Sequence, residues 1–395
     1  MTTSRFSPPP IGLTRLFLKF LRFGCLAFGG PVAQIAMVRQ ALVEEEEWIT
    51  SVRFNRLLAV MQILPGPEAH ELCVHLGMMA RGRIGGLLAG LGFMLPGFFL
   101  MLVAGWLYAD WIIGNPAMIP VFFGVQIVIL VIILRAVQRI GSHILEDKLL
   151  WALAAAAFGA TLAGVPFWIP LAAAGLIYSF AARPGLALLI FAIAAVLALA
   201  FAHFPAARVE HIGAAASRAG VFALFLAGLK GGLLTFGGAY TAIPYVRADT
   251  VGRGWLSDAS FLDGVAIAGI LPAPLVIFAT FAGYVAGGFP GALAITAGMF
   301  LPAFAFSMIF FERLESIADN PALHRLLGGV AAAVVGVIAA TLAQLGWSTA
   351  MRAPDLPVAL LIFGAALVAV WRLKGKLVAP AIIVAGGVGG WLFSL

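Results

Sequence analysis

The chain has 395 residues, of which 63% are hydrophobic and 10% are charged, and its mean hydropathy is +1.07. Soluble domains carry about 25% charged residues, so this composition excludes an ordinary water-facing protein and indicates lipid as the solvent. The net charge of +7 is then typical of Lys and Arg in cytoplasmic loops and does not indicate nucleic-acid binding. Long apolar runs without alternation, such as 187–200, favour membrane helices over the strands of a barrel.

Thirteen apolar segments follow one another along the chain, and several are short for a full span. The predicted fold class is therefore an all-α polytopic membrane protein with about 13 transmembrane segments, in a range of 10–14. With a cytoplasmic N-terminus, seventeen Lys and Arg fall inside and six outside, which is the expected inward bias. The segments lie at 16–36, 57–79, 84–108, 118–138, 149–165, 167–182, 186–203, 220–246, 261–286, 291–311, 326–347, 356–371 and 377–394.

An internal repeat divides the sequence. Residues 22–39, RFGCLAFGGPVAQIAMVR, align without a gap on residues 230–247, KGGLLTFGGAYTAIPYVR, at an offset of 208. Further along and in the same order, ILPGP aligns with ILPAP and MLP with FLP. This order predicts a duplication, with an N-terminal repeat at 1–185, a connector at 186–219 and a C-terminal repeat at 220–395. Because an odd number of spans precedes the second repeat, we expect an inverted topology.

Two apolar segments are interrupted by proline at equivalent positions. Pro65, Gly66 and Pro67 interrupt the first, and Pro272 and Pro274 interrupt the second. Proline removes a backbone donor and breaks a helix, and non-helical backbone at membrane depth lines protein or a water-filled cavity. The N–H groups freed at a helix start bind anions. Paired breaks therefore predict a transport site, with a kink that serves only packing as the alternative.

A matched pair of glycine motifs gives a second set of candidates. FGGP contains Gly29, Gly30 and Pro31, and FGGA contains Gly237 and Gly238. Adjacent glycines allow unusual dihedral angles and close approach of a ligand. Close packing of two helices is the alternative reading.

Four cations accompany these motifs in the same register, namely Arg22 with Lys230 and Arg39 with Arg247. A cation at mid-membrane costs at least about 2.5–3.5 kcal/mol, so cations at such depth indicate function. Together they would stabilise a dianion near the pseudo-twofold axis, in the membrane plane, that relates the two inverted repeats. The alternatives are snorkelling to the interface for Arg22 and Lys230 and loop anchoring for Arg39 and Arg247.

Glu68 directly follows the first break, where the second repeat has Leu275. A lone carboxylate there is a candidate for proton coupling, and capping of the following helix is the alternative role. Nearby, His70 and His75 are five residues apart, which places them about 140° apart on a helix and argues against a metal-chelating pair. We therefore expect no metal, no cofactor and no enzyme, with a membrane metalloenzyme at His70–His75 as the opposing hypothesis.

These motifs, FGGPVAQIAMVRQALVEEEEWIT, ILPGPEA, LLTFGGAYTAIPYV, ILPAPLVIFATF and GMFLPAF, together resemble the chromate ion transporter family in its long, two-repeat form. The resemblance covers nearly the whole chain and marks both breaks, both glycine motifs and Glu68 as functional positions. Ala239 and Ala273 depart from strict repetition, since they stand where Pro31 and Gly66 do. The halves are therefore expected to contribute unequally.

The resemblance implies chromate efflux and chromate resistance in a bacterial inner membrane. Export would be driven by the membrane potential, by a proton gradient as in an antiporter, or by both. The expected partners are chromate or sulfate and the lipid bilayer, with no nucleic acid and with a homodimer as an open option. A sulfate or other oxyanion importer and an anion channel remain the alternatives, because sulfate is also a tetrahedral dianion.

Overall fold

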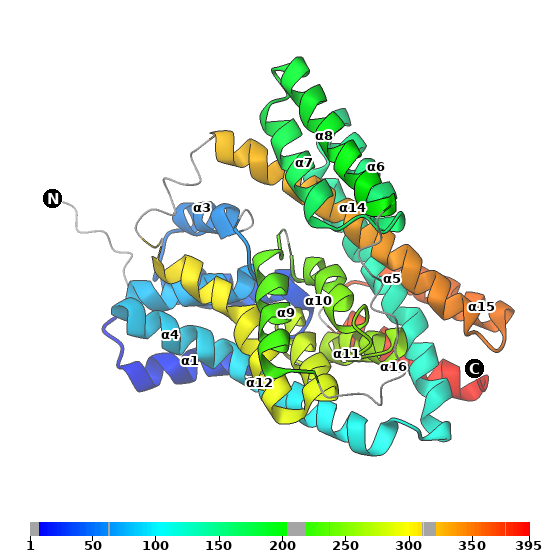
Figure 1. Ribbon diagram of the computed structural model, residues 1–395. Helices are drawn as coiled ribbons and strands as arrows, with labels where there is room; N and C mark the ends of the chain where they lie inside the picture. The colour runs from blue at the N-terminus through cyan, green and yellow to red at the C-terminus, as the bar shows by residue number, and fades with distance from the viewer. Residues whose placement is uncertain are drawn as a thin grey trace. The chain divides into compact units, whose positions relative to one another are not determined.

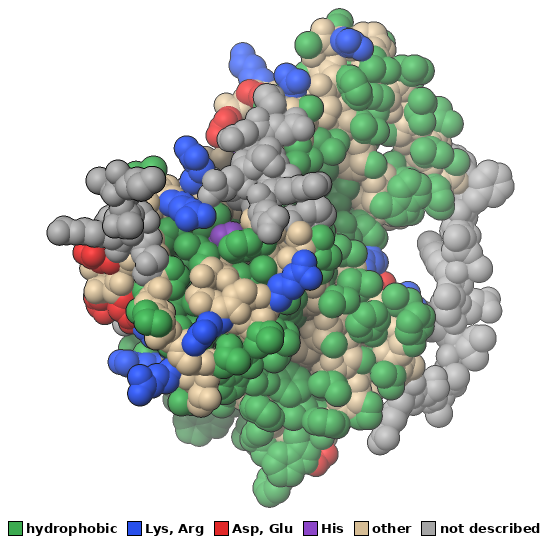
Figure 2. All heavy atoms as spheres, turned by 90° about the vertical axis from the view of Figure 1, so that its left-hand side faces the viewer, with side chains coloured by type: hydrophobic (Ala, Val, Ile, Leu, Met, Phe, Trp, Pro, Cys, Tyr) green, Lys and Arg blue, Asp and Glu red, His purple; other side chains and the backbone are tan. Residues whose placement is uncertain are grey.

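The computed structural model describes residues 8–61, 64–203, 219–236, 238–309, 311, 321–375 and 377–395, and the regular elements in these ranges are all helical. Within them, five helical segments are long and apolar enough to cross a membrane, and five shorter helices are also apolar. Hydrophobic side chains cover most of the described surface on the face shown in Figure 2. The all-helical class is confirmed, and the number of spans stays a prediction. The five long segments are Glu68–Ile112, Pro116–Ile144, Pro184–Phe201, Leu275–Ile309 and Ala322–Met351.

The chain forms two compact units, and each takes helices from both halves of the sequence. Unit 1 consists of Met1–Val131, Arg218–Glu315 and Ala353–Leu395, and unit 2 consists of Ile132–Ser217 and Ser316–Arg352. The predicted boundaries near 185 and 220 concern the sequence duplication and not these units, so they stay predictions.

Unit 1 contains the helices that carry every sequence motif named above (Figure 1). From the first repeat it takes α1 (Leu13–Cys25), α2 (Gly30–Arg39), α3 (Ser51–Met61), α4 (Glu68–Leu107) and the start of α5 (Ile119–Ile144). From the second it takes α9 (Val221–Leu233), α10 (Ile243–Thr250), α11 (Asp258–Ile270), α12 (Phe278–Ile309), α15 (Leu356–Arg372) and α16 (Val378–Leu392).

Unit 2 is built around α14 (Pro321–Met351), which packs on α6 (Lys148–Leu162) and α7 (Trp168–Ser179). The backbones approach closely because glycine faces them: a Cβ atom on Gly336 would lie 2.1 Å from the Ala154 carbonyl oxygen. The unit also holds α8 (Pro184–His203), the predicted connector. Asp147 caps α6 by accepting the Leu150 N–H at 2.8 Å, and this hydrogen bond lowers the pKa of its exposed carboxyl group.

The helices of the two repeats follow the same order, and several match in their bounds or backbone angles. α1 and α9 correspond residue for residue at the offset of 208, and α3 and α11 begin at equivalent positions. Both α4 and α12 are bent at a glycine, with φ 62° and ψ −155° at Gly82 and φ 65° and ψ −159° at Gly288. A left-handed φ of this kind suits glycine. The two kinked helices pack against each other in unit 1.

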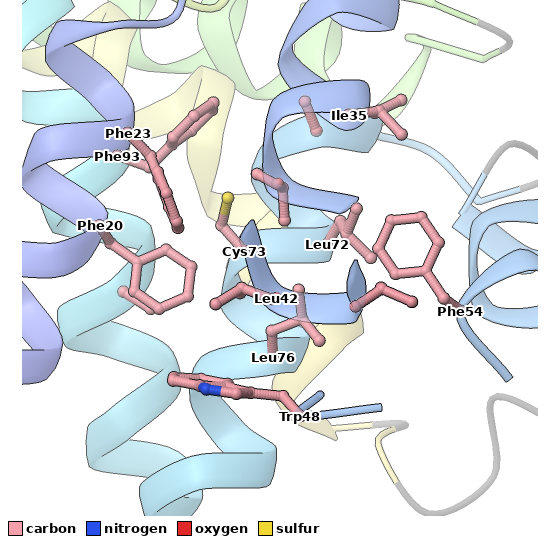
Figure 3. Close-up of a cluster of buried hydrophobic side chains, with 14 of the residues drawn as sticks. Phe20, Phe23, Ile35, Leu42, Trp48, Phe54, Leu72, Cys73, Leu76 and Phe93 are labelled. Carbon is pink, nitrogen blue, oxygen red and sulfur yellow. The ribbon is translucent and has the colours of Figure 1, made fainter. Parts of the chain in front are cut away.

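A cluster of large apolar side chains holds α1, α2, α3 and the first part of α4 together (Figure 3). Phe20, Trp48, Phe54 and Phe93 are fully or almost fully buried in it, and Cys73 lies among them. The rings of Phe20 and Phe23 meet edge to face at 5.5 Å between centroids, a favoured aromatic arrangement. This core fixes α4 against the helices that lead into both motifs of the first repeat.

Candidate functional site

The first break separates α3 from α4. α3 ends at Met61, α4 begins at Glu68, and Pro67 before it is extended, with ψ 102°. Gly66 has a φ of +146°, a conformation that a side chain rarely adopts. Its N–H donates to the Thr235 carbonyl oxygen at 2.8 Å. The break therefore contacts the segment of the second repeat that leads into the second glycine motif.

The second break lies in a corresponding place. α11 ends at Ile270, and the chain passes through Pro272, Ala273 and Pro274 before a short 3-10 turn leads into α12. The Ala273 carbonyl oxygen accepts a hydrogen bond of 2.9 Å from Nε2 of Gln34 in α2, and the same Nε2 donates to the Ala27 carbonyl oxygen at 2.9 Å. Ala27 is the repeat equivalent of Thr235. Each break therefore reaches the same place in the opposite repeat.

The glycine motifs follow directly from these two contact points. Gly29 and Gly30 have φ of 87° and 77°, and Gly238 has φ of 130°. Pro31 then lies in the first turn of α2, where its missing N–H costs nothing. Gly237 lies outside the described residues. The structure thus brings each break beside the glycine motif of the other repeat, as a shared site requires.

Each break also packs on the kinked helix of the opposite repeat. A Cβ atom on Gly66 would lie 3.3 Å from the Ala303 Cβ in α12, and a Cβ atom on Gly97 in α4 would lie 2.4 Å from the Ala273 Cβ. Gly97 and Ala303 follow the matched prolines of MLP and FLP. The small residues at these points allow a non-helical backbone to lie against a helix.

The four predicted cations lie in less uniform surroundings. Lys230 Nζ pairs with Asp249 at 2.8 Å, and Arg247 donates to both carboxylate oxygens of Asp258 at 2.8 and 3.0 Å. Arg39 donates to the Ser51 hydroxyl at 3.0 Å and Arg22 is exposed. Ser51 and Asp258 are equivalent first residues of α3 and α11, so Arg39 and Arg247 hold the same junction in both repeats. A direct role for any of the four in substrate binding stays a prediction.

We expect Arg247→Gln and Asp258→Asn to lower the free energy of unfolding by similar amounts, about 1.5–3 kcal/mol, because both remove the same partly buried, charge-assisted contact. Arg39→Gln should cost less, since its side chain is 41% exposed. Denaturation in detergent measures the stabilities, and transport by the same variants decides the role. If Arg247→Gln abolishes transport while Asp258→Asn leaves it unchanged, Arg247 binds substrate and is not a structural clamp.

Acidic and imidazole side chains gather in the first turns of α4. Glu68 is 7% exposed and Glu71 and His70 are fully buried. The His70 ring meets Phe300 and Phe304 at 4.9 and 4.7 Å between centroids. The His75 ring stacks at 4.5 Å on Phe311, so the two histidines face different aromatic neighbours.

Two polar residues at the breaks escaped the sequence analysis. Gln34 lies within FGGPVAQ and donates to the carbonyl oxygens of Ala27 and Ala273 in two different loops. No local sequence pattern predicts this role. Glu71 is three residues after Glu68 and hence on the same helix face. That spacing was the available signal for a second carboxyl group at the first break.

Two repeats of helices that are interrupted at equivalent points, with the interruptions brought together inside the bundle, are an arrangement typical of membrane transporters with broken helices. The comparison with protein families is more specific. The chromate transporter family model matches residues 14–196 and again 222–391. The chain belongs to the chromate transporter family.

Several curated proteins are similar over most of their length. The chromate transport protein of Pseudomonas aeruginosa is 54% identical over 99% of this chain and 94% of its own, and that of Cupriavidus metallidurans is 32% identical over 96% and 92%. An uncharacterized transporter of Methanocaldococcus jannaschii is 27% identical over 82% of both chains. No solved structure matches the chain.

Proposed function

We propose that the chain is a secondary transporter, not an enzyme, that exports chromate across the bacterial inner membrane and confers chromate resistance. The observation that carries the proposal is the contact of each break with the loop of the opposite repeat, through Gly66 to Thr235 and through Gln34 to Ala273. The similarity to the Pseudomonas aeruginosa chromate transport protein supplies the substrate. Sulfate, as another tetrahedral dianion, is the natural competitor.

The oxyanion is proposed to bind where the breaks meet the glycine motifs. Backbone N–H groups that no helix uses are available at such a place, and they suit an anion at membrane depth. The residues concerned are Pro65, Gly66 and Pro67, then Pro272 and Pro274, then Gly29, Gly30 and Pro31, and finally Gly237 and Gly238. Arg22, Arg39, Lys230 and Arg247 would add a favourable positive field, weakened by their carboxylate partners.

We also propose that the two repeats have inverted topology with a cytoplasmic N-terminus. The odd number of predicted spans before the second repeat and the inward bias of Lys and Arg support this orientation. Alternating access then consists of one repeat moving against the other around the shared breaks. Such a motion needs small contact residues, which Gly97 and Ala303 provide.

The membrane potential alone can drive this export. One charge that crosses 100 mV gains about 2.3 kcal/mol, so a dianion leaving a negative interior gains about 4.6 kcal/mol per 100 mV. Proton coupling would modify this voltage-driven export, and Glu68 at the break is its proposed first carboxyl group.

Everted membrane vesicles that contain the protein should take up chromate when a potential, positive inside, is imposed without a pH gradient. Vesicles without the protein serve as the control. If sulfate competes at concentrations near those of chromate, the protein is a broader oxyanion transporter. If single-channel currents appear, it is an anion channel. Glu68→Gln should remove any dependence of uptake on a pH gradient, and a dependence that survives this change would exclude Glu68.

A further inference from the structure

The Glu71 carboxyl group is buried against the first break and has no hydrogen-bond partner among the described residues. The residue is 0% exposed, and neither carboxyl oxygen forms a hydrogen bond within the described part of the chain. Its side chain lies against Gly66, because a Cβ atom on Gly66 would be 2.5 Å from Oε1. The Gly66 N–H in turn bonds to Thr235 of the second repeat. A charge on Glu71 would therefore act directly at the proposed oxyanion site.

The described surroundings of Glu71 offer it no counter-ion. Glu68, one turn earlier on α4, is the acidic neighbour, and α12 presents Ala303 and the Ser307 hydroxyl, which donates to the Glu71 backbone oxygen at 3.4 Å. His70 faces the phenylalanines of α12, and His75 lies further along α4 on the side of Arg53. Lys230 and Arg247 are paired with aspartates. A buried carboxylate in such a place is unfavourable unless it is neutralised.

The second repeat shows that packing does not require this carboxyl group. Phe278 occupies the equivalent of Glu71 and Leu275 that of Glu68, and both side chains are buried. The same fold therefore accommodates apolar residues at these positions. The first repeat retains an acid where the second has a hydrocarbon, which indicates a chemical role.

We infer that Glu71 binds the proton that accompanies the oxyanion, so that the anion occupies the first break only when the Glu71 carboxyl group is neutral. The inference rests on the proposed function and adds whether the proton and the anion assist or oppose each other's binding. An ionised Glu71 repels a dianion, while a protonated one does not, so the proton and the anion favour each other's binding by the same factor. Glu68, slightly exposed, passes the proton between the break and Glu71. An antiporter requires the opposite sign, in which the anion displaces the proton.

Calorimetry of chromate binding to the purified full-length chain tests this sign. Titrations in alkaline buffers of different ionisation enthalpy, where chromate itself is fully a dianion, give the number of protons taken up with each anion. At a pH high enough to ionise Glu71 in the free protein, wild type should take up close to one proton, and its affinity should fall by up to about tenfold for each further pH unit. Glu71→Gln, a neutral isostere, should bind chromate with no proton uptake and a flat pH profile. Asp110→Asn removes an exposed carboxyl group and should behave as wild type.

Any of three results would overturn the inference. These are proton release by wild type on binding, proton uptake that persists in Glu71→Gln, and proton uptake that is lost in Glu68→Gln but not in Glu71→Gln. Absence of chromate binding by folded wild type would instead overturn the proposed function. Dicyclohexylcarbodiimide labelling of wild type keeps the test valid if the Glu71 variant does not fold, because this apolar reagent modifies protonated carboxyl groups. Mass spectrometry should then find the label on Glu71, and the extent of labelling should be lower when the reaction is run at alkaline pH. Label found on Glu68 alone contradicts the assignment.

Discussion

Replacement of Gly232 with alanine should destabilise the transporter by about 1–3 kcal/mol, the range found for overpacking of a well-packed interior. A Cβ atom there would lie 2.3 Å from the Met299 carbonyl oxygen and 3.1 Å from the Pro302 ring. Because the nearest atom belongs to the α12 backbone, no side-chain rotation relieves the overlap, and α9 must move away from α12. The melting temperature in detergent measures the loss, and transport should fall with it because α9 leads directly to the second glycine motif.

Two further glycines test whether this packing belongs to the repeat. Gly24 is equivalent to Gly232, and its Cβ would lie 2.5 Å from the Phe93 carbonyl oxygen, so Gly24→Ala should show a similar loss. Gly364 is also in an apolar helix, but no atom of the described residues lies within 4 Å of its Cβ position. Gly364→Ala should gain about 0.5–1 kcal/mol from helix propensity. Equal melting temperatures for all three variants would show that close backbone contact does not hold these helices.

The sequence predicted those parts of the fold that depend on local backbone chemistry. The proline pairs at 65–67 and 272–274 each remove two backbone donors within three residues, and both interruptions occur there. Matching of the two repeats located equivalent helices because duplicated segments keep their lengths. The apolar segments that end at 79 and begin at 84 likewise predicted a break, and the backbone angles at Arg81 and Gly82 between them are non-helical.

The pairing of charges depended on the tertiary structure. Lys230 resembled an unpaired cation in an apolar segment, but folding brings Asp249 of α10 to 2.8 Å. Arg247 likewise meets Asp258 across a loop. A repeat alignment compares residues with their equivalents and carries no information on such partners. The field at the proposed site is therefore weaker than four unpaired cations would produce.

Local sequence patterns also could not predict which helix of one repeat packs on which helix of the other. α5 of the first repeat packs on α16 of the second, with a Cβ on Gly124 only 2.1 Å from the Gly386 carbonyl oxygen. In unit 2, α14 of the second repeat packs in the same way on α7 of the first, at Gly329 and Ala174. Hydrophobic periodicity shows that a helix has an apolar face, but it does not select the partner.

Substitution of Gly66 by alanine should reduce chromate transport by at least about tenfold while the chain still folds. The repeat alone predicts tolerance, because the equivalent residue of the second break is already Ala273. The structure predicts the opposite result. Gly66 has a φ of +146°, and a residue with a side chain in that region is strained by about 1–3 kcal/mol. Such strain at the break displaces the Gly66 N–H from Thr235, and 1.4 kcal/mol is already about tenfold in rate.

The two sources of this loss can be separated, since the added Cβ would also lie 2.5 Å from Oε1 of Glu71. Glu71→Ala combined with Gly66→Ala removes the steric contact but leaves the backbone strain. A double-mutant cycle on transport rates and melting temperatures therefore separates the effect of backbone strain at residue 66 from that of the steric contact with the Glu71 carboxyl group. Ala273→Gly is the matched control, because Ala273 has an ordinary φ, and it should change transport little. Wild-type transport by Gly66→Ala would mean that the first break relaxes freely and that its left-handed glycine does not position the site.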